Sequence, residues 1–301
     1  MNTEKQAETS NCELKQKPGS KTNTQATLNS VAAEQEQRLK TKMSKIKHKI
    51  AVISGKGGVG KSTITVNLAA AFTLQGYKNK VGVLDADIHG PCVPKMLGLK
   101  GQKIIGGPDG TLFPVSGKRG IKVVSMDFLL PNDEVPVVWR GPLKMRIIQQ
   151  FLADIAWGEL DFLLVDLPPG TGDEPLSVMQ LIPDIDGVII VTMPSEVSQA
   201  VVKKAITFAK QLGVPVIGII ENMSGFVCPE CGATLNIFKT GGGKKIAEDL
   251  SVPYLGKIPI DPAICVDSDS GTPFVTGNKE SPTVKAFTEI VTKIKHFLKV
   301  A

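Results

Sequence analysis

Six short runs of apolar residues recur along the chain, and segments of helical length separate them. The runs show no polar alternation, which is typical of strands buried on both faces of a sheet. Segments with apolar residues at helical spacing include 62–76, 143–157 and 196–212. We therefore expect an α/β fold, with a mostly parallel sheet and helices on both of its faces. The six runs are 50–54, 81–84, 123–125, 162–165, 188–191 and 216–220.

The N-terminal segment 1–47 differs in composition from the rest. It is rich in Lys, Gln, Glu, Thr, Ser and Asn, so we predict a disordered tail and a single folded domain over 48–301. Residues 1–49 hold ten Lys or Arg and five Glu, which accounts for most of the formal net charge of +6. The folded part is then close to neutral, and nucleic-acid binding is not expected.

No segment has the length or apolar character of a bilayer span or a signal-peptide core. The five cysteines do not form the dense, even-numbered framework of a small secreted protein. A reducing, cytoplasmic location is therefore expected, without attachment to a membrane.

The segment from Gly55 to Ser62 matches the phosphate-binding pattern G-x-x-x-x-G-K-[ST] between the first apolar run and the first helical segment. Its glycines let backbone N–H groups converge on phosphate, Lys61 adds a positive charge, and Ser62 can ligate Mg²⁺. Gly55, Gly57 and Gly60 also fit a dinucleotide loop, but that loop has no use for the Lys-Ser pair. We expect a nucleoside triphosphate, contacted by Gly55, Lys56, Gly57, Gly58, Val59, Gly60, Lys61, Ser62 and Thr63.

Acidic residues follow two of the apolar runs, where the strands of such a sheet end. Asp166 has the position of a carboxylate that holds Mg²⁺, and the N–H of Gly170 is a candidate donor to the γ-phosphate. Asp87 is the candidate that orients the attacking water, and Asp85 is expected to support Mg²⁺ or Lys61. The alternative is that these acids only cap turns and helices. His89 is expected to be an ordinary packed or solvent-facing histidine.

Cys228 and Cys231 form a C-x-x-C motif after the last of the six runs. Two thiolates fill half of a four-ligand site. Cys12, Cys92 and Cys265 are candidates for the missing ligands, although Cys92 and Cys265 are more simply explained as small buried thiols. Alternatively, the loops of two subunits meet at a two-fold axis and together bind a [4Fe–4S] cluster or one Zn²⁺. Thiol–disulfide exchange is a further option.

Together these motifs resemble the Mrp/ApbC family of iron-sulfur cluster carrier ATPases, within the deviant Walker A class that includes MinD and the nitrogenase iron protein. The resemblance covers residues 48–280. It rests on GKGGVGKST, DADIHGP with PKMLGL, VVWRGPLK, DLPPGTGDEPLS, ENMSGFVCPECG, GGGKKIAEDL, and IPIDP with SDSGTPFV.

The resemblance implies that Lys56 reaches the partner's nucleotide in a homodimer and that Asn222 contacts the adenine of ATP. It also implies that Cys228 and Cys231 hold a [4Fe–4S] cluster shared by two subunits. Members of the family use ATP binding and hydrolysis to assemble the cluster or transfer it to apoproteins. We therefore expect a slow ATPase, with Lys56, Lys61 and Asp87 in catalytic roles, that carries clusters to apo iron-sulfur proteins.

Two other functions fit the same sequence. A structural zinc clip at the C-x-x-C motif would keep the ATPase without the cluster. A MinD-like positioning switch would bind a membrane surface through the last helix, where an apolar face alternates with lysines, although the same face would also pack on the sheet. That face consists of Val284, Phe287, Ile290, Val291, Ile294, Phe297 and Leu298.

Overall fold

The computed structural model describes residues 33–108, 110–130, 141–228, 230–277 and 280–300. The chain divides into two compact units after Gln37. Of the first unit only 33–37 are described, and they are helical. Everything that follows concerns the second unit, Arg38–Ala301.

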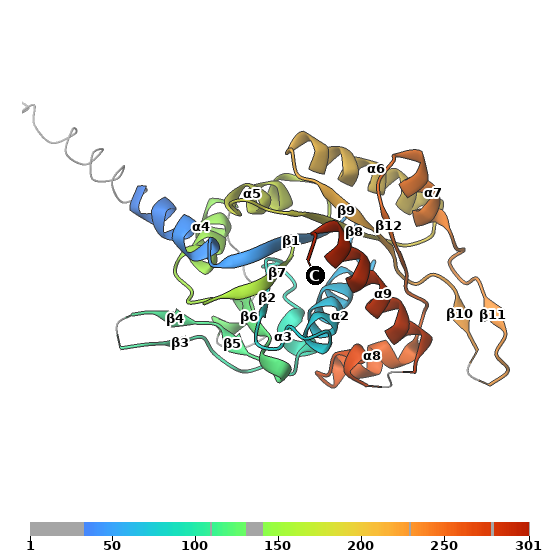
Figure 1. The fold of residues 1–301 in the computed structure, drawn as a ribbon, viewed down its shortest axis with the longest axis horizontal. Coiled ribbons are helices and arrows are strands. Elements are labelled where there is room, and N and C mark those ends of the chain that lie inside the picture. Colours follow the sequence, from blue (N-terminus) through green and yellow to red (C-terminus); the bar gives the residue numbers. More distant parts are fainter. Residues whose placement is uncertain (1–32, 109, 131–140, 229, 278–279, 301) are drawn as a thin grey trace, which may run out of the picture. The chain divides into compact units, whose positions relative to one another are not determined.

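Within the described residues, eight strands form one sheet in the order β12-β9-β8-β1-β7-β2-β6-β5 (Figure 1). All neighbouring strands are parallel except β5 and β6. The strands are β1 (Ile46–Ser54), β2 (Val81–Asp85), β5 (Val115–Ser116), β6 (Lys122–Ser125), β7 (Leu160–Asp166), β8 (Gly187–Thr192), β9 (Val216–Glu221) and β12 (Tyr254–Lys257). The six predicted strands are confirmed, and the short edge strands β5 and β12 were not predicted.

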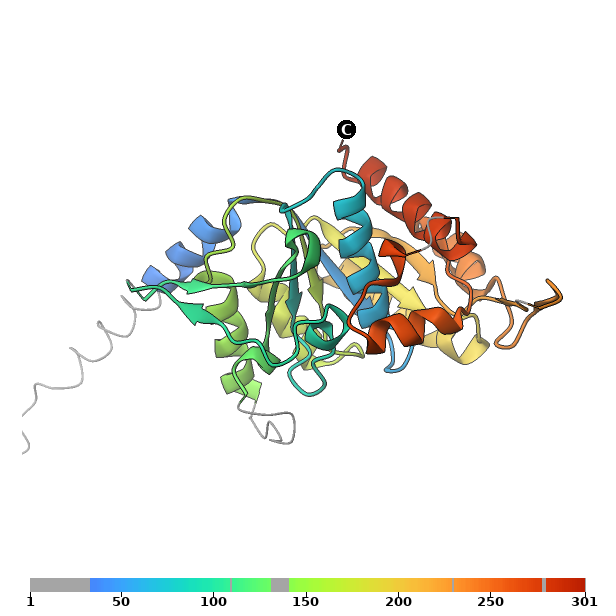
Figure 2. The same cartoon turned by 90° about the horizontal axis from the view of Figure 1, so that it is seen from below.

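Helices cover both faces of this sheet, as expected (Figure 2). The α-helices are α2 (Lys61–Leu74), α3 (Val93–Met96), α4 (Gly141–Ala153), α5 (Asp173–Leu181), α6 (Glu196–Gln211), α7 (Gly242–Asp249), α8 (Pro262–Asp269) and α9 (Pro282–Phe297). Short 3₁₀ turns are η1 (Lys118–Gly120), η2 (Met126–Phe128) and η3 (Phe274–Thr276).

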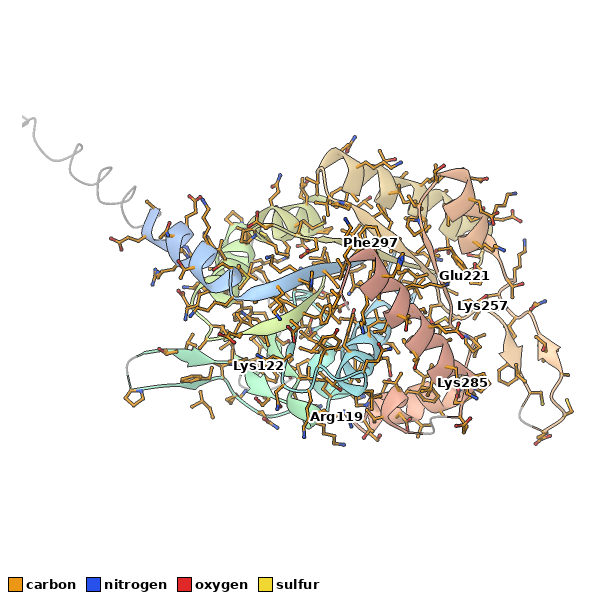
Figure 3. All side chains as sticks on the ribbon, in the orientation of Figure 1. Arg119, Lys122, Glu221, Lys257, Lys285 and Phe297 are labelled. Atoms are coloured by element: carbon orange, nitrogen blue, oxygen red, sulfur yellow. The ribbon has the colours of Figure 1, made fainter. Side chains whose placement is uncertain are left out.

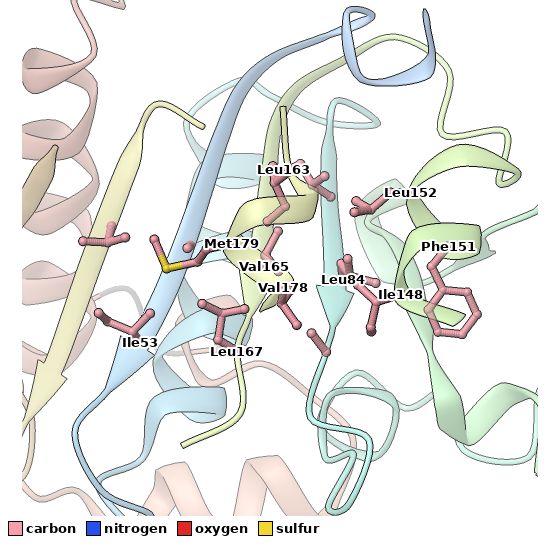
Figure 4. Packing of buried hydrophobic residues seen from close by; sticks show 14 of the residues in the cluster. Ile53, Leu84, Ile148, Phe151, Leu152, Leu163, Val165, Leu167, Val178 and Met179 are labelled. Carbon is pink, nitrogen blue, oxygen red and sulfur yellow. The ribbon is translucent and has the colours of Figure 1, made fainter. Parts of the chain in front are cut away.

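Alternate side chains of the central strands enter two separate cores. On β1, Ile50 and Val52 pack with α2 and α9, whereas Ala51 and Ile53 pack with α4, α5, α6 and α7. Figure 4 shows the second of these cores, where Ile148 and Phe151 of α4 approach the sheet. Because both faces of the strand are buried, its sequence is apolar without alternation.

The ordered part of the large unit begins earlier than the predicted boundary at residue 48. Residues 38–43 are helical, and Leu39, Met43 and Ile46 are buried in the core. These apolar side chains are four and three residues apart, a spacing that is typical of a helix with one buried face. The polar composition of the rest of the segment made this pattern hard to recognise. The predicted disorder of 1–32 concerns residues outside the described ranges.

Two antiparallel hairpins extend the fold beyond the main sheet. One joins β3 (Ile105–Gly106) to β4 (Leu112–Phe113), and the other joins β10 (Phe226–Val227) to β11 (Thr234–Leu235). The second projects away from the layered body in both ribbon views (Figures 1 and 2). Cys228 and Cys231 lie between its two strands.

The last helix, α9, packs its apolar face on the sheet and against α2. Phe287, Ile290, Val291 and Ile294 are at most 1% exposed. The alternative in which this face inserts into a membrane surface is therefore wrong for these residues, because the protein core already covers them. Among the described residues, no helix combines the length and apolarity needed to cross a bilayer.

Truncation of Ile294 to Ala should destabilise the domain by about 2–5 kcal/mol, because it opens a cavity in a packed core. Thr292→Ala, on the exposed side of the same helix, should change stability by less than about 0.5 kcal/mol. Denaturant unfolding of both variants measures the difference. Equal effects would show that α9 does not contribute a core face.

Candidate nucleotide and metal site

The phosphate-binding loop, residues 55–62 (the P-loop), connects β1 to α2, which is the context that the motif requires. Gly60 precedes the helix with a φ of 81°, in the left-handed region that favours glycine. A Cβ at this position would lie 2.3 Å from Nδ2 of Asn222. Glycine is therefore needed here both for its backbone conformation and for the close approach of Asn222.

Asp166, at the end of β7, is fully buried and holds the start of α2. Its Oδ2 lies 2.8 Å from Nζ of Lys61 and accepts a hydrogen bond of 2.6 Å from Oγ of Ser62. Its Oδ1 accepts a hydrogen bond of 2.8 Å from Oγ1 of Thr65. The predicted Mg²⁺ ligands Ser62 and Asp166 are thus in direct contact. Thr65 was not predicted, although it lies one helical turn after Lys61.

Asp85, at the end of β2, lies beside Asp166 in the parallel register. Its oxygens accept hydrogen bonds from the backbone N–H groups of Asp87 and Val93 and from Oγ of Ser125. Burial, followed by the neighbouring charge of Asp166, raises the pKa of Asp85 well above its ordinary value. This arrangement favours Asp85 as the group that holds the loop after β2, while its predicted contact with Mg²⁺ stays a prediction.

A cavity of about 230 Å³ lies over the P-loop. Gly57, Gly58, Lys61, Ser62, Thr63 and Asp87 are among its lining residues. Asp87 therefore faces the space where phosphates are expected, and Oδ1 of Asp87 accepts from the N–H of Gly90 at 3.3 Å. The prediction for Gly170 is not supported, because its N–H donates to the carbonyl of Ser54 at 2.8 Å.

A second cavity, of about 350 Å³, adjoins the first at Gly60 and Thr63. Its walls are mainly apolar, and Asn222 contributes the buried polar side chain. Nδ2 of Asn222 donates to the carbonyl of Val59 at 2.8 Å, so the amide oxygen is directed elsewhere. An apolar slot with one amide beside a phosphate loop suits a nucleotide base.

Lys56, the residue implied to act across a dimer, is half-buried in the P-loop. Its carbonyl accepts from Oγ of Ser54 at 3.0 Å. Among the described residues, none forms an ion pair with its ammonium group.

Three polar side chains meet beside this site without having been predicted to do so. Nζ of the buried Lys144 on α4 contacts Oε1 of Glu174 on α5 at 2.5 Å and also contacts Nε2 of His89. The hydrogen bond from Lys144 lowers the pKa of Glu174. His89 is thus an ion-network residue rather than an isolated one. The sequence feature that could have indicated this contact is Lys144, a lysine within the apolar helical pattern of 143–157.

The cysteine pair occupies the turn of the β10–β11 hairpin. The N–H of Cys228 donates to the carbonyl of Ala233, and the N–H of Gly232 donates to the carbonyl of Cys228. The backbone N–H groups of Cys231 and Glu230 donate to the Cys228 sulfur and lower the pKa of its thiol. A lowered pKa favours the thiolate, which is the form that binds metals.

Cys92 and Cys265 do not belong to this pair. Both are exposed rather than buried, which corrects the expectation for them, and each lines a cavity beside the P-loop. Among the described residues, no group of three or more His, Cys, Asp or Glu side chains is placed to hold a metal ion. Within the described chain, Cys228 and Cys231 therefore supply two ligands and no more. Cys12 lies outside the described residues.

The mostly parallel sheet has a P-loop after the central strand β1, and the buried Asp166 contacts Lys61 and Ser62 of that loop. These features define a P-loop nucleoside triphosphatase of the MinD/ParA type. The chain belongs to the ParA family described as NUBPL iron-transfer P-loop NTPases, whose pattern it matches over residues 45–295.

Similar proteins include an iron-sulfur cluster carrier protein of Methanocaldococcus jannaschii, 59% identical over 81% of this chain and 83% of the relative. One of the same name from Saccharolobus solfataricus is 53% identical over 85% of this chain and 86% of the relative. A nucleotide-binding protein of Archaeoglobus fulgidus, solved with ADP, has a TM-score of 0.70 at 44% identity, covering 79% of this chain and 92% of that one. MinD of Aquifex aeolicus shares the fold at 22% identity and a TM-score of 0.59, over 83% and 97% of the two chains.

The lowered pKa of Cys228 makes a kinetic prediction for the metal-free protein. Its alkylation by iodoacetamide should reach half its maximal rate below pH 9.0, the ordinary pKa of a thiol. Although the Cys92 side chain is exposed, partial desolvation of its sulfur at the cavity wall, followed by the charges of Asp85 and Asp87, raises the pKa of its thiol. Alkylation of Cys92 should therefore reach its midpoint at a higher pH. Peptide mass spectrometry across a pH series measures both. A higher midpoint for Cys228 than for Cys92 would contradict the geometry of the turn.

Proposed function

We propose that this protein is an ATP-hydrolysing iron-sulfur cluster carrier that binds a [4Fe–4S] cluster as a homodimer and transfers it to apoproteins in the cytoplasm. The observation that carries the proposal is the pair Cys228 and Cys231, displayed on a projecting hairpin with only half of a four-sulfur ligand set. The names of the two archaeal relatives support the choice of cargo.

The nucleotide half of the proposal rests on the P-loop and its neighbours. The N–H groups of the loop and Lys61 would neutralise phosphate charge, and Asn222 with the apolar cavity would hold the adenine. Mg²⁺, when bound, would supply further charge neutralisation at the phosphates, with Ser62 and Asp166 as its holders. Asp87, which faces the cavity, would orient the attacking water.

Two features of the cysteine hairpin support the proposed homodimer. A second copy of the hairpin would supply two further thiolates, and a two-fold axis brings identical loops together. The hairpin also carries exposed apolar side chains, with Val227, Leu235 and Ile237 between 51% and 56% exposed. Such side chains beside the cysteines suit an interface that closes over the cluster.

Anaerobic reconstitution with iron and sulfide tests the cargo. The wild type should develop broad visible absorption and bind about four irons per dimer, and a Cys228→Ala/Cys231→Ala variant should bind none. Cys92→Ala/Cys265→Ala, which removes two other free thiols, is the matched control and should load normally. Zinc at one per dimer with little iron in anaerobically purified protein would instead support the structural clip.

The proposed role of Lys56 across the dimer can be tested by subunit mixing. Lys56→Ala should lower the ATP hydrolysis rate at least about tenfold, while Lys78→Ala, an exposed lysine after α2, should not. Mixing Lys56→Ala subunits with Lys61→Ala subunits should restore part of the activity, because the second subunit supplies Lys56 to the nucleotide of the first. No recovery on mixing would place the action of Lys56 within its own subunit.

A further inference from the structure

Glu221, the last residue of β9, is a buried carboxylate in an unusual setting (Figure 3). It is 0% exposed, and among the described residues no lysine or arginine forms an ion pair with it. Its Oε1 accepts from the N–H of Gly241 at 2.9 Å and from Oγ of Ser224, and its Oε2 accepts from the N–H of Gly243 at 2.5 Å. These charge-assisted hydrogen bonds compensate its burial.

The three donors come from opposite ends of one segment. Ser224 lies just before the β10–β11 hairpin, and Gly241 and Gly243 lie just after it, at the start of α7. One carboxylate therefore ties together both ends of the stretch that displays the two cysteines. No described part of that stretch belongs to a strand of the main sheet. The Glu221 contacts hold its base together with two backbone hydrogen bonds, from the N–H of Ser224 to the carbonyl of Ile258 and from the N–H of Ile260 to the carbonyl of Gly225.

Close packing around this contact explains why residues 241–243 are all glycine. Gly241 has a φ of 83°, and a Cβ on Gly242 would lie 2.2 Å from the carbonyl oxygen of Pro194. A Cβ on Gly243 would lie 3.0 Å from Oε2 of Glu221. The glycines thus allow the positive end of α7 to close onto the carboxylate.

The next residue, Asn222, holds the P-loop. Its side-chain Nδ2 donates to the carbonyl of Val59, and its backbone N–H donates to the carbonyl of Thr192. The segment that carries the cysteines also returns to the nucleotide site, because Phe238 lines the same apolar cavity as Gly60 and Asn222. Two adjacent residues therefore connect the nucleotide cavity to the hairpin.

We propose that Glu221 is a positioning residue that transmits the nucleotide state of the P-loop to the cysteine hairpin. A nucleotide that fills the cavity would bear on Asn222 and Phe238, and the Glu221 contacts would convert this into a change in the exposure of Cys228 and Cys231. The inference rests on the proposed function only for what the coupling would serve, namely the control of a bound cluster. The contacts that would transmit the coupling involve no metal.

The test uses metal-free, full-length protein. Alkylation rates of Cys228 and Cys231 are measured at one pH without nucleotide, with Mg-ADP, and with Mg²⁺ and a non-hydrolysable ATP analogue. In the wild type, nucleotide should change these rates about fivefold or more, the usual range of a coupling between sites. In Glu221→Gln the change should fall below about twofold, while the affinity for ATP stays within about twofold of wild type.

Glu196→Gln is the matched control. Oε1 of Glu196 lies 2.8 Å from Nζ of Lys239, in the same segment as the hairpin, but its side chain is 77% exposed. The identical chemical change at this surface pair should leave the nucleotide response intact, because exposed ion pairs contribute little.

Full nucleotide dependence in Glu221→Gln, or none in the wild type, would overturn the inference. If Glu221→Gln does not fold, Ser224→Ala removes a single donor and should reduce the response while raising hydrogen exchange over 223–241. An unchanged response and exchange in Ser224→Ala would equally overturn it. Anaerobic reconstitution tests separately whether the protein binds an iron-sulfur cluster. A failure of the coupling and a failure of the proposed cargo are therefore distinguishable.

Discussion

The contact between Lys61 and Asp166 is the constraint on which the rest of the site depends. It requires β1 and β7 to be parallel neighbours, so that the loop after one strand meets the carboxylate that ends the other. The same register places Asp85 beside Asp166, and the two acids with one lysine make the end of the sheet a buried ionic centre. Two apolar cores hold these strands from both faces. The two apolar cores therefore fix the relative positions of three ionisable side chains, Lys61, Asp85 and Asp166.

A second buried polar centre lies at the end of β9, where the Glu221 carboxylate contacts residues from distant segments. Here the compensating positive charge is the start of a helix rather than a lysine, which suits a contact between segments distant in sequence. Asn222 follows Glu221 directly at the end of β9, and its side chain donates to the carbonyl of Val59 in the P-loop. The fold thus places the nucleotide cavity and the cysteine hairpin on either side of two consecutive residues. A route this short needs no long chain of side chains to carry a response.

Much of this arrangement could be predicted from the sequence. The six strands, the mostly parallel character of their sheet and the P-loop follow from apolar runs and one motif, because these are properties of local sequence. The order of the strands in the sheet could not be read in this way. The buried helix 38–43 was missed because its few apolar residues are diluted by polar ones. Glu221, Lys144 and Glu174 could not be assigned because their meaning lies in contacts between distant segments. Gly170 was misassigned for the same reason, since it lies in the loop after β7 and its partner Ser54 is the distant last residue of β1.

The proposed homodimer would supply two contacts that the described subunit does not make by itself. The cysteine hairpin offers two sulfurs, and Lys56 has no ionic partner among the described residues. If the same pairing of subunits brings four sulfurs together and places each Lys56 at the opposite nucleotide, then binding ATP and holding the cluster become parts of one assembly step. Tighter nucleotide binding would then stabilise the dimer, and by reciprocity a bound cluster would favour the nucleotide-bound form. Hydrolysis would weaken that pairing, which gives a physical reason for an ATPase to carry a cargo that needs no energy for its own coordination.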